Sequence, residues 1–291
     1  MNAGVRNDVA AALGADVLDA RPIGGGDIND AYAVSLGDGR LVFVKTNARA
    51  PADMFAAEAR GLAWLAEAGA LRVPDVLAAG ERFLALELLR AARPAADYDE
   101  RFGRGLAALH GFGADSFGLD HDNYIGRLPQ ANDPPDDSAD DPADDWCAFY
   151  RERRLEPQLR AAVDAGHIRA PLRRRFDDLL ARLEDLVGPG EPPARLHGDL
   201  WGGNKHVDDA GGPCIIDPAA YGGHREIDLA MMQLFGGFGA RVFEAYDEAQ
   251  PLAPGWRERV PLYQLYPILV HVNLFGGGYV GSAESALDRI G

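Results

Sequence analysis

The chain has 291 residues, with 45 acidic against 29 basic side chains and a formal net charge of −16. Nucleic-acid phosphates and anionic membrane surfaces attract clusters of Lys and Arg, so neither is an expected partner of so acidic a protein. The two cysteines, Cys147 and Cys214, form neither a CxxC pair nor a disulfide framework, which indicates a reducing, cytoplasmic setting. The length and the hydrophobic content of 47% suit one large globular unit or two lobes.

The first 90 residues predict a small, β-rich unit. An Asp-Gly turn between two apolar runs is a strong hairpin signal, and it occurs at Asp38-Gly39. The spacing of Phe55, Leu62 and Leu65 is that of a helix. We therefore expect strands at residues 31–36, 41–44, 76–79 and 82–88, and a helix over residues 52–68.

From residue 90 onward the composition becomes helical. Helices are expected at 97–110, 146–165 and 171–187, followed by a polar segment at 195–232 and further helices. The segment 131–145 holds seven Asp, three Pro and no basic residue, which predicts a solvated, flexible insertion. The basic helices around 151–154 and 173–175 carry interspersed acids, which predicts salt-bridged surface.

Neither a secretion signal nor a membrane span is expected. Asp8 and Asp16 interrupt the apolar core that a signal peptide would need. Residues 260–283 contain no Asp, Glu, Lys or Arg, a length that could suggest a membrane span. However, Pro261, Pro267 and the glycines at 276–278 favour a buried helix followed by a loop.

The densest polar signal is the sequence HGDLWGGN at residues 197–204, followed by Asp217 at the end of an apolar run. Phosphoryl transfer needs a carboxylate that orients the attacking hydroxyl and accepts its proton, together with ligands that hold Mg²⁺ on the phosphates. An Asn carbonyl and an Asp carboxylate are suitable hard ligands for magnesium. Asp199, Asn204 and Asp217 are therefore candidates for these tasks.

The front part of the chain supplies candidates for nucleotide binding. Gly24, Gly25 and Gly26 would let backbone N–H groups approach phosphates without a Cβ clash, although a plain tight turn explains them equally well. Lys45 ends a predicted strand and would reach the α- and β-phosphates, and Glu58 on the next helix is placed to hold its ammonium group. The chain has no GxxxxGK[ST] element, so a P-loop NTPase is not supported. In this chain order the residues form the protein-kinase arrangement.

Over nearly its full length the chain resembles the fructosamine kinase (ketosamine-3-kinase) family of the protein-kinase-like and aminoglycoside phosphotransferase-like superfamily. The motifs that carry the resemblance are GGDINDAY (25–32), VFVKTN (42–47), MFAAE (54–58), HGDLWGGN (197–204), IDPA (216–219), GHREIDLA (223–230) and HVNLFG (271–276). Trp201, the KTN sequence and the NLFG segment favour this family over choline kinases and aminoglycoside phosphotransferases.

The resemblance implies an α+β fold with two lobes, as in protein kinases. The smaller, β-rich lobe would span residues 1–89 and bind nucleotide. The larger, mainly helical lobe would span residues 90–291, carry catalysis and substrate binding, and include the insertion at 131–145. The chain is expected to be a monomer or a weak dimer.

The resemblance also implies an activity, namely ATP-dependent phosphorylation of the sugar 3-hydroxyl of a ketosamine, which leads to loss of the sugar and so to deglycation. Carried over by position, Asp199 would be the base, Asn204 and Asp217 the magnesium ligands, and Lys45 with Glu58 the phosphate clamp. The hinge that reads adenine would lie at Glu87 to Leu89.

Other polar residues are given supporting or substrate-binding tasks. Asp228 and His197 are expected to brace the catalytic loop by hydrogen bonds, because Asp199 already serves as the base. Trp201, His271 and Asn273 are the candidate substrate contacts, although His271 is equally well explained as a satisfied polar residue of a buried helix.

Two positions depart from the family pattern. Lys205-His206 follows Asn204 where relatives usually have small or apolar residues, and Lys205 could bind phosphate or a carboxylate, or point to solvent. Asp27 stands in the glycine loop where many relatives have Cys, so a redox-controlled thiol is not available there.

Two other functions remain open at this point. One is phosphorylation of an aminoglycoside, choline or another amino alcohol, since these substrates are also cationic and would suit an acidic site. The other is a nucleotide-binding pseudokinase that serves as a scaffold.

Overall fold

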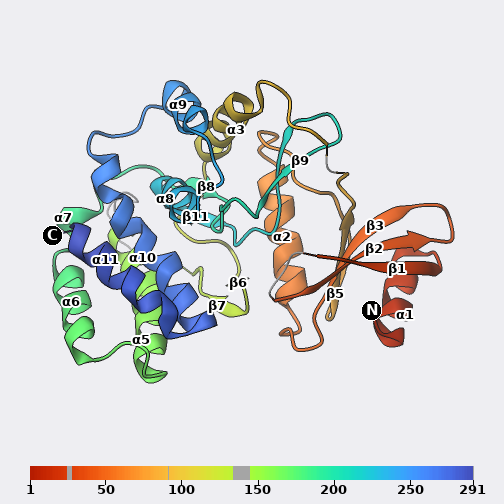
Figure 1. Cartoon of the computed structure of the whole chain (residues 1–291), viewed down its shortest axis with the longest axis horizontal. Helices are drawn as coiled ribbons and strands as arrows, with labels where there is room; N and C mark the ends of the chain where they lie inside the picture. The colour runs from red at the N-terminus through yellow and green to blue at the C-terminus, as the bar shows by residue number, and fades with distance from the viewer. Residues whose placement is uncertain (25–27, 91, 134–144, 291) are drawn as a thin grey trace.

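The structure is a computed structural model and describes residues 1–24, 28–90, 92–133 and 145–290 (Figure 1). Its N-terminal part is built on an antiparallel sheet with the strand order β1-β2-β3-β5-β4. The elements are α1 (Ala3–Leu13), β1 (Val17–Ile23), β2 (Asp30–Leu36), β3 (Leu41–Thr46), α2 (Met54–Ala66), β4 (Val76–Gly80) and β5 (Phe83–Glu87). The sequence did not predict α1, whereas the hairpins and α2 lie where they were expected.

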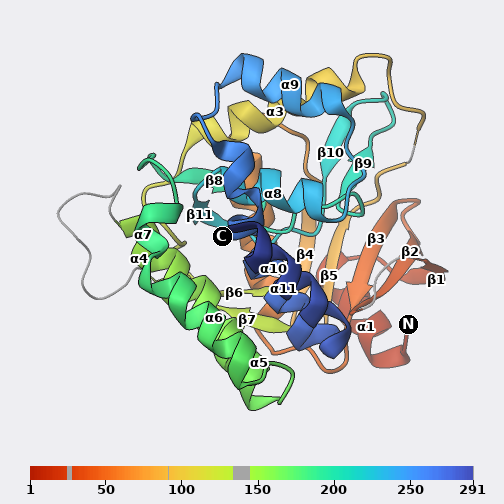
Figure 2. The same cartoon turned by 60° about the vertical axis from the view of Figure 1, so that its left-hand side comes forward.

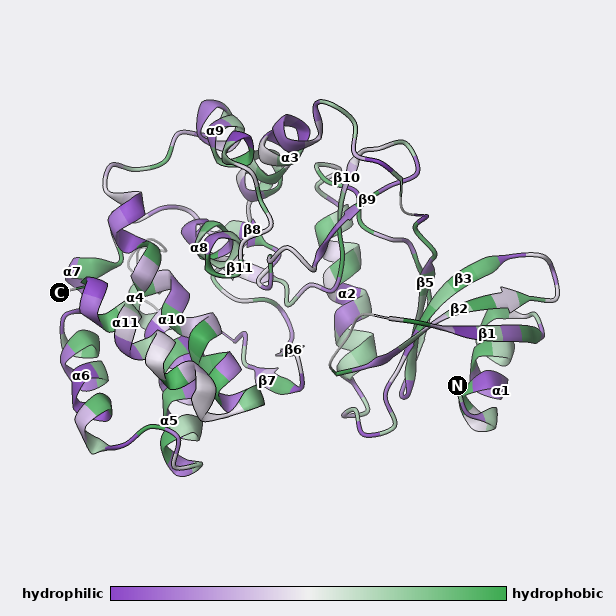
Figure 3. Ribbon diagram, viewed as in Figure 1, coloured by the Kyte–Doolittle hydropathy of each residue, from purple (hydrophilic) through white to green (hydrophobic). Residues whose placement is uncertain are grey.

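The two faces of this sheet are covered by different helices. Side chains alternate along a strand, so Phe83 and Ala85 of β5 pack in a cluster with α1, while Leu84 and Leu86 pack in the main core with α2. Strand β3 lies between β2 and β5 and is mostly hydrophobic, as Figure 3 shows. This burial on both sides fixes the end of β3, where Lys45 lies.

The rest of the chain is mainly helical and forms the larger part of the molecule. Its helical elements are α3 (Tyr98–Phe112), α4 (Asp145–Phe149), η1 (Tyr150–Leu155), α5 (Glu156–Asp164), α6 (Ala170–Ala181), α7 (Leu183–Leu186), α8 (Glu226–Leu234), α9 (Ala240–Ala249), α10 (Trp256–Phe275), η2 (Gly277–Tyr279) and α11 (Val280–Ile290). Its short strands are β6 (Asn123–Ile125), β7 (Leu128–Gln130), β8 (Ala194–Leu196), β9 (Lys205–Val207), β10 (Pro213–Ile215) and β11 (Tyr221–Gly223).

Short strands and a buried helix position the catalytic segment. Strands β8 and β11 pair, as do β9 and β10, so the loops after β8 and after β10 are held together. Helix α10 is buried over its middle part and packs beside α5, α8 and α11 (Figure 2). In the described part of the chain no helix is long and apolar enough to cross a membrane. The expected loop after α10 is instead a single turn, η2, that leads into α11.

The predicted helix over 146–165 is interrupted by the π-helical segment η1. Within it, Arg154 is fully buried and was wrongly predicted to lie on the surface. Its guanidinium carbon lies 3.9 Å from the centre of the Tyr221 ring and 4.6 Å from that of Phe149, and its Nη2 donates to Asn132 Oδ1 at 2.7 Å. Cation–π contacts and a neutral acceptor therefore replace the expected carboxylate partners.

The structure agrees with the predicted fold class, a small β-rich lobe and a larger helical lobe. The exact division at residue 89 stays a prediction. Most of the predicted insertion at 131–145 lies outside the described residues.

Candidate active site

The candidate active site is a cavity of about 750 Å³ between the N-terminal sheet and the helical part. The residues expected to perform phosphoryl transfer all line it, namely Lys45, Glu58, Asp199, Asn204 and Asp217. They come from β3, α2, the loop between β8 and β9, and the segment after β10. The fold thus brings together side chains that are as much as 172 positions apart in the sequence.

Lys45 lies between two carboxylates. Its Nζ donates to Glu58 Oε1 at 2.7 Å and to Asp217 Oδ1 at 2.9 Å, and the residue is only 5% exposed. Burial alone would lower the pKa of Lys45, but the two carboxylates hold it above its usual value. Burial raises the pKa of Glu58, and the Lys45 ammonium opposes that change. A fixed, permanently charged ammonium group is what a phosphate clamp requires.

Asp199 has an environment suited to proton transfer. Burial raises its pKa to about 7, against the effect of a hydrogen bond from Asn204 and with the support of the Asp217 and Asp228 carboxylates. Asn204 Nδ2 donates to Asp199 Oδ2 at 3.1 Å and to the Asp199 carbonyl at 2.8 Å. A base is most efficient when its pKa lies near the working pH, so this position is appropriate for a general base.

Asn204 and Asp217 offer the donor set that Mg²⁺ prefers. In the described part of the chain, the hydrogen bonds of the Asn204 side chain are all donated by Nδ2, so Oδ1 remains as a ligand atom. Asp217 uses Oδ1 for Lys45 and has φ 54°, in the left-handed region that Asp tolerates better than most residues. These oxygens fit a magnesium site, in which Asn204 and Asp217 would hold the ion and phosphate and water would be further ligands.

Asp228 of α8 lies beneath the catalytic loop and is fully buried. Its Oδ2 accepts from the backbone N of His197 at 2.8 Å, and its Oδ1 accepts from Gly198 N at 2.9 Å. Although burial raises the pKa of Asp228, hydrogen bonds and the adjacent His110 ring lower it below its ordinary value. His197 Nε2 donates to the carbonyl of Ile216 at 2.9 Å, which ties the loop to the segment that carries Asp217.

His110 completes this support and was not recognised from the sequence. Its Nε2 lies 3.2 Å from Asp228 Oδ2, and its Nδ1 lies 2.8 Å from the hydroxyl of Tyr246 in α9. A single histidine in a predicted helix gives no signal of such a contact, because its partners are 118 and 136 positions away.

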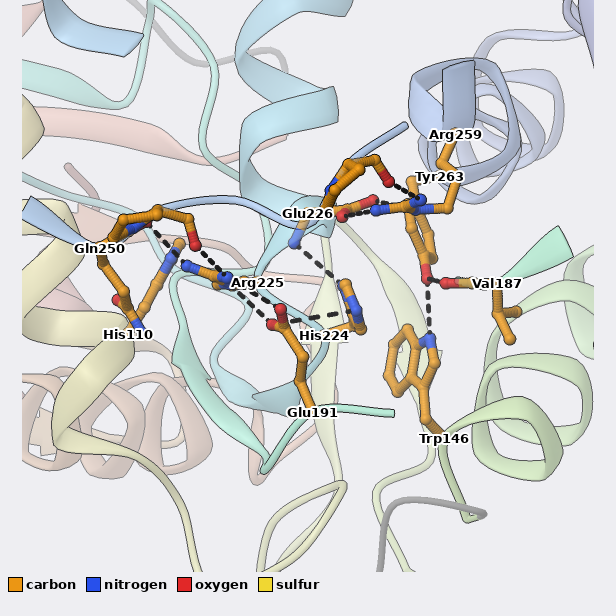
Figure 4. Close-up of polar contacts among 12 residues, drawn as sticks. His110, Trp146, Val187, Glu191, His224, Arg225, Glu226, Gln250, Arg259 and Tyr263 are labelled. Atoms are coloured by element: carbon orange, nitrogen blue, oxygen red, sulfur yellow. Dashed lines mark hydrogen bonds and ion pairs between the residues drawn. The ribbon is translucent and has the colours of Figure 1, made fainter. Parts of the chain in front are cut away.

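The start of α8 is anchored by two ion pairs, which Figure 4 shows. Arg225 donates to Glu191 through Nε at 2.7 Å and Nη2 at 2.8 Å, and Arg259 donates to the buried Glu226 through Nε at 2.8 Å. His224 packs against the Tyr263 ring, and burial lowers its pKa to about 4, so it stays neutral. Because Asp228 follows in the next positions of α8, these anchors set its place below the catalytic loop.

A cluster of aromatic rings, here called the aromatic wall, also lines the cavity. It consists of Trp201, Phe235, His271, Phe275 and Tyr279. The His271 ring centre lies 4.6 Å from that of Phe235 and 5.0 Å from that of Tyr279. Burial lowers the pKa of His271, and its Nδ1 donates to the Pro267 carbonyl at 2.7 Å, which leaves Nε2 of the neutral ring as an acceptor. Phe235, Phe275 and Tyr279 were not predicted as site residues.

The glycine loop is only partly described. Gly24 follows β1, while Gly25, Gly26 and Asp27 lie outside the described residues. Directly after them, Ile28 and Asn29 line the cavity. Asn47 holds this side of the loop, because its Nδ2 donates to the Ile28 carbonyl at 3.2 Å and to Asn29 Oδ1 at 3.1 Å.

The expected hinge lies outside the lining of the cavity. Neither Glu87 nor Leu89 is among the lining residues, and the Glu87 carboxylate is paired with Arg72. Adenine recognition by backbone groups at these positions stays a prediction.

Two polar residues have other partners than those considered from the sequence. Asn273 does not line the cavity, because its Nδ2 donates to the side chain of Gln158 at 2.7 Å. Lys205 donates to the Gly237 carbonyl and lies 4.9 Å from the centre of the Phe238 ring, so it braces the adjacent loop. A contact of Asn273 with the substrate stays a prediction.

Comparison with known proteins agrees with this geometry. The sequence profile of the fructosamine kinase family matches residues 1–290. A Synechocystis protein named "Probable ketoamine kinase" is 41% identical over 280 residues, which cover 94% of this chain and 90% of that protein. The Arabidopsis thaliana "Protein-ribulosamine 3-kinase, chloroplastic" is 37% identical over 276 residues, covering 91% and 80% of the two chains.

A solved structure shows the same fold. The Thermobifida fusca protein called "putative fructosamine-3-kinase" superposes with a TM-score of 0.88 at 43% identity, covering 98% of each chain. The predicted family and kinase-like fold are thereby confirmed. The chain belongs to the fructosamine kinase family.

Proposed function

We propose that this protein transfers the γ-phosphoryl group of ATP to the 3-hydroxyl of the sugar in a ketosamine. One observation supports this proposal most strongly. The same cavity holds the aromatic wall and a set of charged residues, here called the charged set, which consists of Lys45, Glu58, Asp199 and Asp217. The charged set suits the phosphates, and the aromatic wall suits the apolar face of a sugar ring. Membership of the fructosamine kinase family supports the same assignment.

In the proposed reaction, Asp199 orients the 3-hydroxyl and accepts its proton as the oxygen attacks the γ-phosphorus. The bond between that phosphorus and the bridging oxygen breaks, and ADP leaves. Lys45, held by Glu58, fixes the phosphates in line with the hydroxyl, because positioning and charge stabilisation provide most of the catalysis in phosphoryl transfer. The phosphorylated product then loses its sugar, and the amine is released.

Asn204 and Asp217 would hold Mg²⁺, which neutralises the charge on the phosphates when bound. Asp217 would then exchange its present contact with Lys45 for a contact with the ion. Asp228 and His110 keep the backbone of the loop in place throughout, so that Asp199 stays within reach of the acceptor.

The aromatic wall also bears on the alternatives. The described lining holds three carboxylates, Glu58, Asp199 and Asp217, and all of them belong to the charged set. An aminoglycoside carries several ammonium groups and would need further acids on the acceptor side. A quaternary ammonium such as choline would suit aromatic rings by cation–π contact, so choline is the second candidate acceptor.

A phosphate-transfer assay on a substrate panel tests the proposal. The panel contains fructose- and ribulose-lysine adducts, choline and aminoglycosides, with formation of ADP and of phosphorylated product both measured. Turnover of ketosamines, lost in Asp199→Asn, is the expected result. Turnover of choline alone would overturn the ketosamine assignment, and ATP binding without any turnover would favour a scaffold.

A further inference from the structure

A short hairpin lies between the two parts of the molecule and was not predicted from the sequence. It consists of β6, a turn and β7, and is here called the 123–130 hairpin. Strand β6 contacts α2 of the N-terminal part, and Figure 1 shows the hairpin between α2 and the C-terminal helices. Four of its residues, from Asn123 to Gly126, line the active-site cavity. The hairpin is therefore a wall of the site that touches both lobes.

The base of the hairpin is fixed to the helical lobe by buried hydrogen bonds. Asn123 Nδ2 donates to the carbonyl of Ala220 at 2.8 Å, and Gln130 Nε2 donates to Asn123 Oδ1 at 2.7 Å. The hydroxyl of Tyr266 in α10 donates to Gln130 Oε1 at 2.6 Å. Because Ala220 follows Asp217 by three residues, this network fixes the hairpin relative to the proposed magnesium ligand.

The turn of the hairpin contacts Leu274, near the aromatic wall, and Ile28, which follows the glycine loop. Arg127 Nη2 donates to the carbonyl of Leu274, near the end of α10. Gly126 has φ 61°, and a Cβ built there would lie 2.7 Å from Ile28 Cδ1 and 3.1 Å from Leu274 Cδ1. Only glycine fits this backbone and this spacing without displacing a neighbour. Ile28 thus rests directly on the turn.

One hydrogen bond connects the hairpin with the start of α2. The hydroxyl of Tyr124 donates to Asp53 Oδ1 at 2.7 Å. Asp53 is the residue before α2, the helix that carries Glu58. Burial and the contact with Asp53 raise the pKa of Tyr124 to about 12, so the hydroxyl stays protonated and acts as a donor at neutral pH. Tyr124 itself lines the cavity.

We propose that Tyr124 is a positioning residue that couples the binding of ATP to the binding of the acceptor. Its hydrogen bond to Asp53 connects the N-terminal lobe, which carries Lys45 and Glu58, with the 123–130 hairpin. The hairpin is in turn fixed to the segment that follows Asp217 and to α10. ATP and acceptor occupy the two sides of the same cavity, so the ligand that binds first orders the hairpin and α2 together through this bond, and the second ligand then meets an ordered wall. The identity of the two ligands rests on the proposed function.

The test compares wild type with Tyr124→Phe. The dissociation constant of a non-hydrolysable ATP analogue is measured with and without saturating ketosamine, together with kcat and KM. In Tyr124→Phe we expect ATP affinity alone to stay within twofold of wild type. The gain in ATP affinity caused by the acceptor should fall about three- to tenfold, a factor that corresponds to the free energy of one hydrogen bond. The KM for the acceptor should rise by a similar factor.

Further variants separate this role from a general effect on folding. Asp53→Ala should reproduce the loss, the double variant should lose no more than either single variant, and Asp53→Asn, which keeps an acceptor oxygen, should restore most of the coupling. Tyr32→Phe removes the same hydroxyl from β2 and should behave as wild type. Additive losses, or unchanged coupling and unchanged acceptor KM in Tyr124→Phe, would overturn the proposal.

A measurement that needs no acceptor distinguishes this proposal from the proposed function. On addition of the ATP analogue, amide hydrogen exchange in the 123–130 hairpin should slow in wild type and in Tyr32→Phe, but not in Tyr124→Phe. If wild type shows no ketosamine turnover but keeps this protection, the substrate assignment is wrong and the proposed role of Tyr124 is supported. If turnover is present and the hairpin amides are equally protected from exchange in all variants, the proposed role of Tyr124 is wrong.

Discussion

Lys45 of the N-terminal sheet donates directly to Asp217 of the helical lobe, at 2.9 Å across the cavity. The same ammonium group also binds Glu58 at 2.7 Å. In the absence of phosphates, one ammonium group is therefore shared between two carboxylates. When nucleotide and magnesium bind, the contact between Lys45 and Asp217 would be lost. Lys45 would stay paired with Glu58, and Asp217 would bind the metal.

Replacement of Lys45 tests its pairing with Glu58 and its role in binding phosphates. Lys45→Met should abolish most phosphate transfer, because the clamp is lost, and should lower the free energy of unfolding by about 3 kcal/mol, because Glu58 is left buried without its partner. The double variant Lys45→Met/Glu58→Gln should recover much of the stability but none of the activity. Chemical denaturation and initial-rate assays measure the two effects. Equal stability of the single and double variants would contradict the pairing.

The raised pKa of Asp199 predicts a dependence of activity on pH. A base must be deprotonated to act, so kcat/KM at saturating magnesium should fall below about pH 7, tenfold per pH unit on the acidic side. In Asp199→Asn the rate should fall by at least about 10²-fold at all pH values. A rate that is flat from pH 5 to 8 would exclude Asp199 as the base.

The same shift predicts an effect on stability that needs no substrate. The pKa of Asp199 is higher in the fold than in the unfolded chain, so its charged form is disfavoured by folding. As pH rises from about 4 to 7, wild type should therefore lose about 1–2 kcal/mol relative to Asp199→Asn, a partial effect because the residue is only partly buried. Parallel unfolding curves of the two proteins at pH 4, 5.5 and 8 provide the measurement, and a constant difference would refute it.

Loss of the Asp228 carboxylate should loosen the catalytic loop. Asp228→Ala leaves the buried N–H groups of His197 and Gly198 without an acceptor and should cost roughly 2–4 kcal/mol of stability. Asp228→Asn keeps one acceptor oxygen and should cost less. Because the pKa of Asp228 is lowered in the fold, this contribution is present above pH 4 and is lost as the pH falls further. Thermal unfolding of the three proteins at pH 7 tests the order.

The aromatic wall should determine acceptor binding rather than nucleotide binding. Trp201 is 41% exposed, so Trp201→Ala should fold normally, raise the KM for the ketosamine by about tenfold or more, and leave the KM for ATP within twofold. Phe112→Ala is a matched control, because Phe112 is another exposed aromatic residue that does not line the cavity. A rise in both KM values would show that Trp201 acts on the loop as a whole.

Local patterns were sufficient to predict much of the fold and part of the site. The Lys45 strand, the helix with Glu58 and the loop from Asp199 to Asn204 each have a signal within a few neighbouring residues. The structure brings these side chains into one cavity, while their chemical roles remain predictions that the experiments above address.

Contacts between distant parts of the chain could not be predicted in this way. The His110–Asp228 contact and the Tyr124–Asp53 bond join residues 118 and 71 positions apart, and no local pattern marks either pair. Arg154 was misread for a related reason. Its neighbours in sequence are charged, but the π-helical segment turns its side chain into the aromatic interior.

The burial of Arg154 has a consequence for the acidic stretch of the sequence. Arg154 holds Asn132 on one side of that stretch, and the buried ring of Trp146 stacks on Tyr150 on the other. The two ends are thus fixed by the interior of the lobe and do not depend on the number of residues between them, since the entropy of closing a loop changes slowly with its length. We accordingly expect variants with a shorter or longer segment between Asn132 and Trp146 to keep the packing of Arg154 and Trp146.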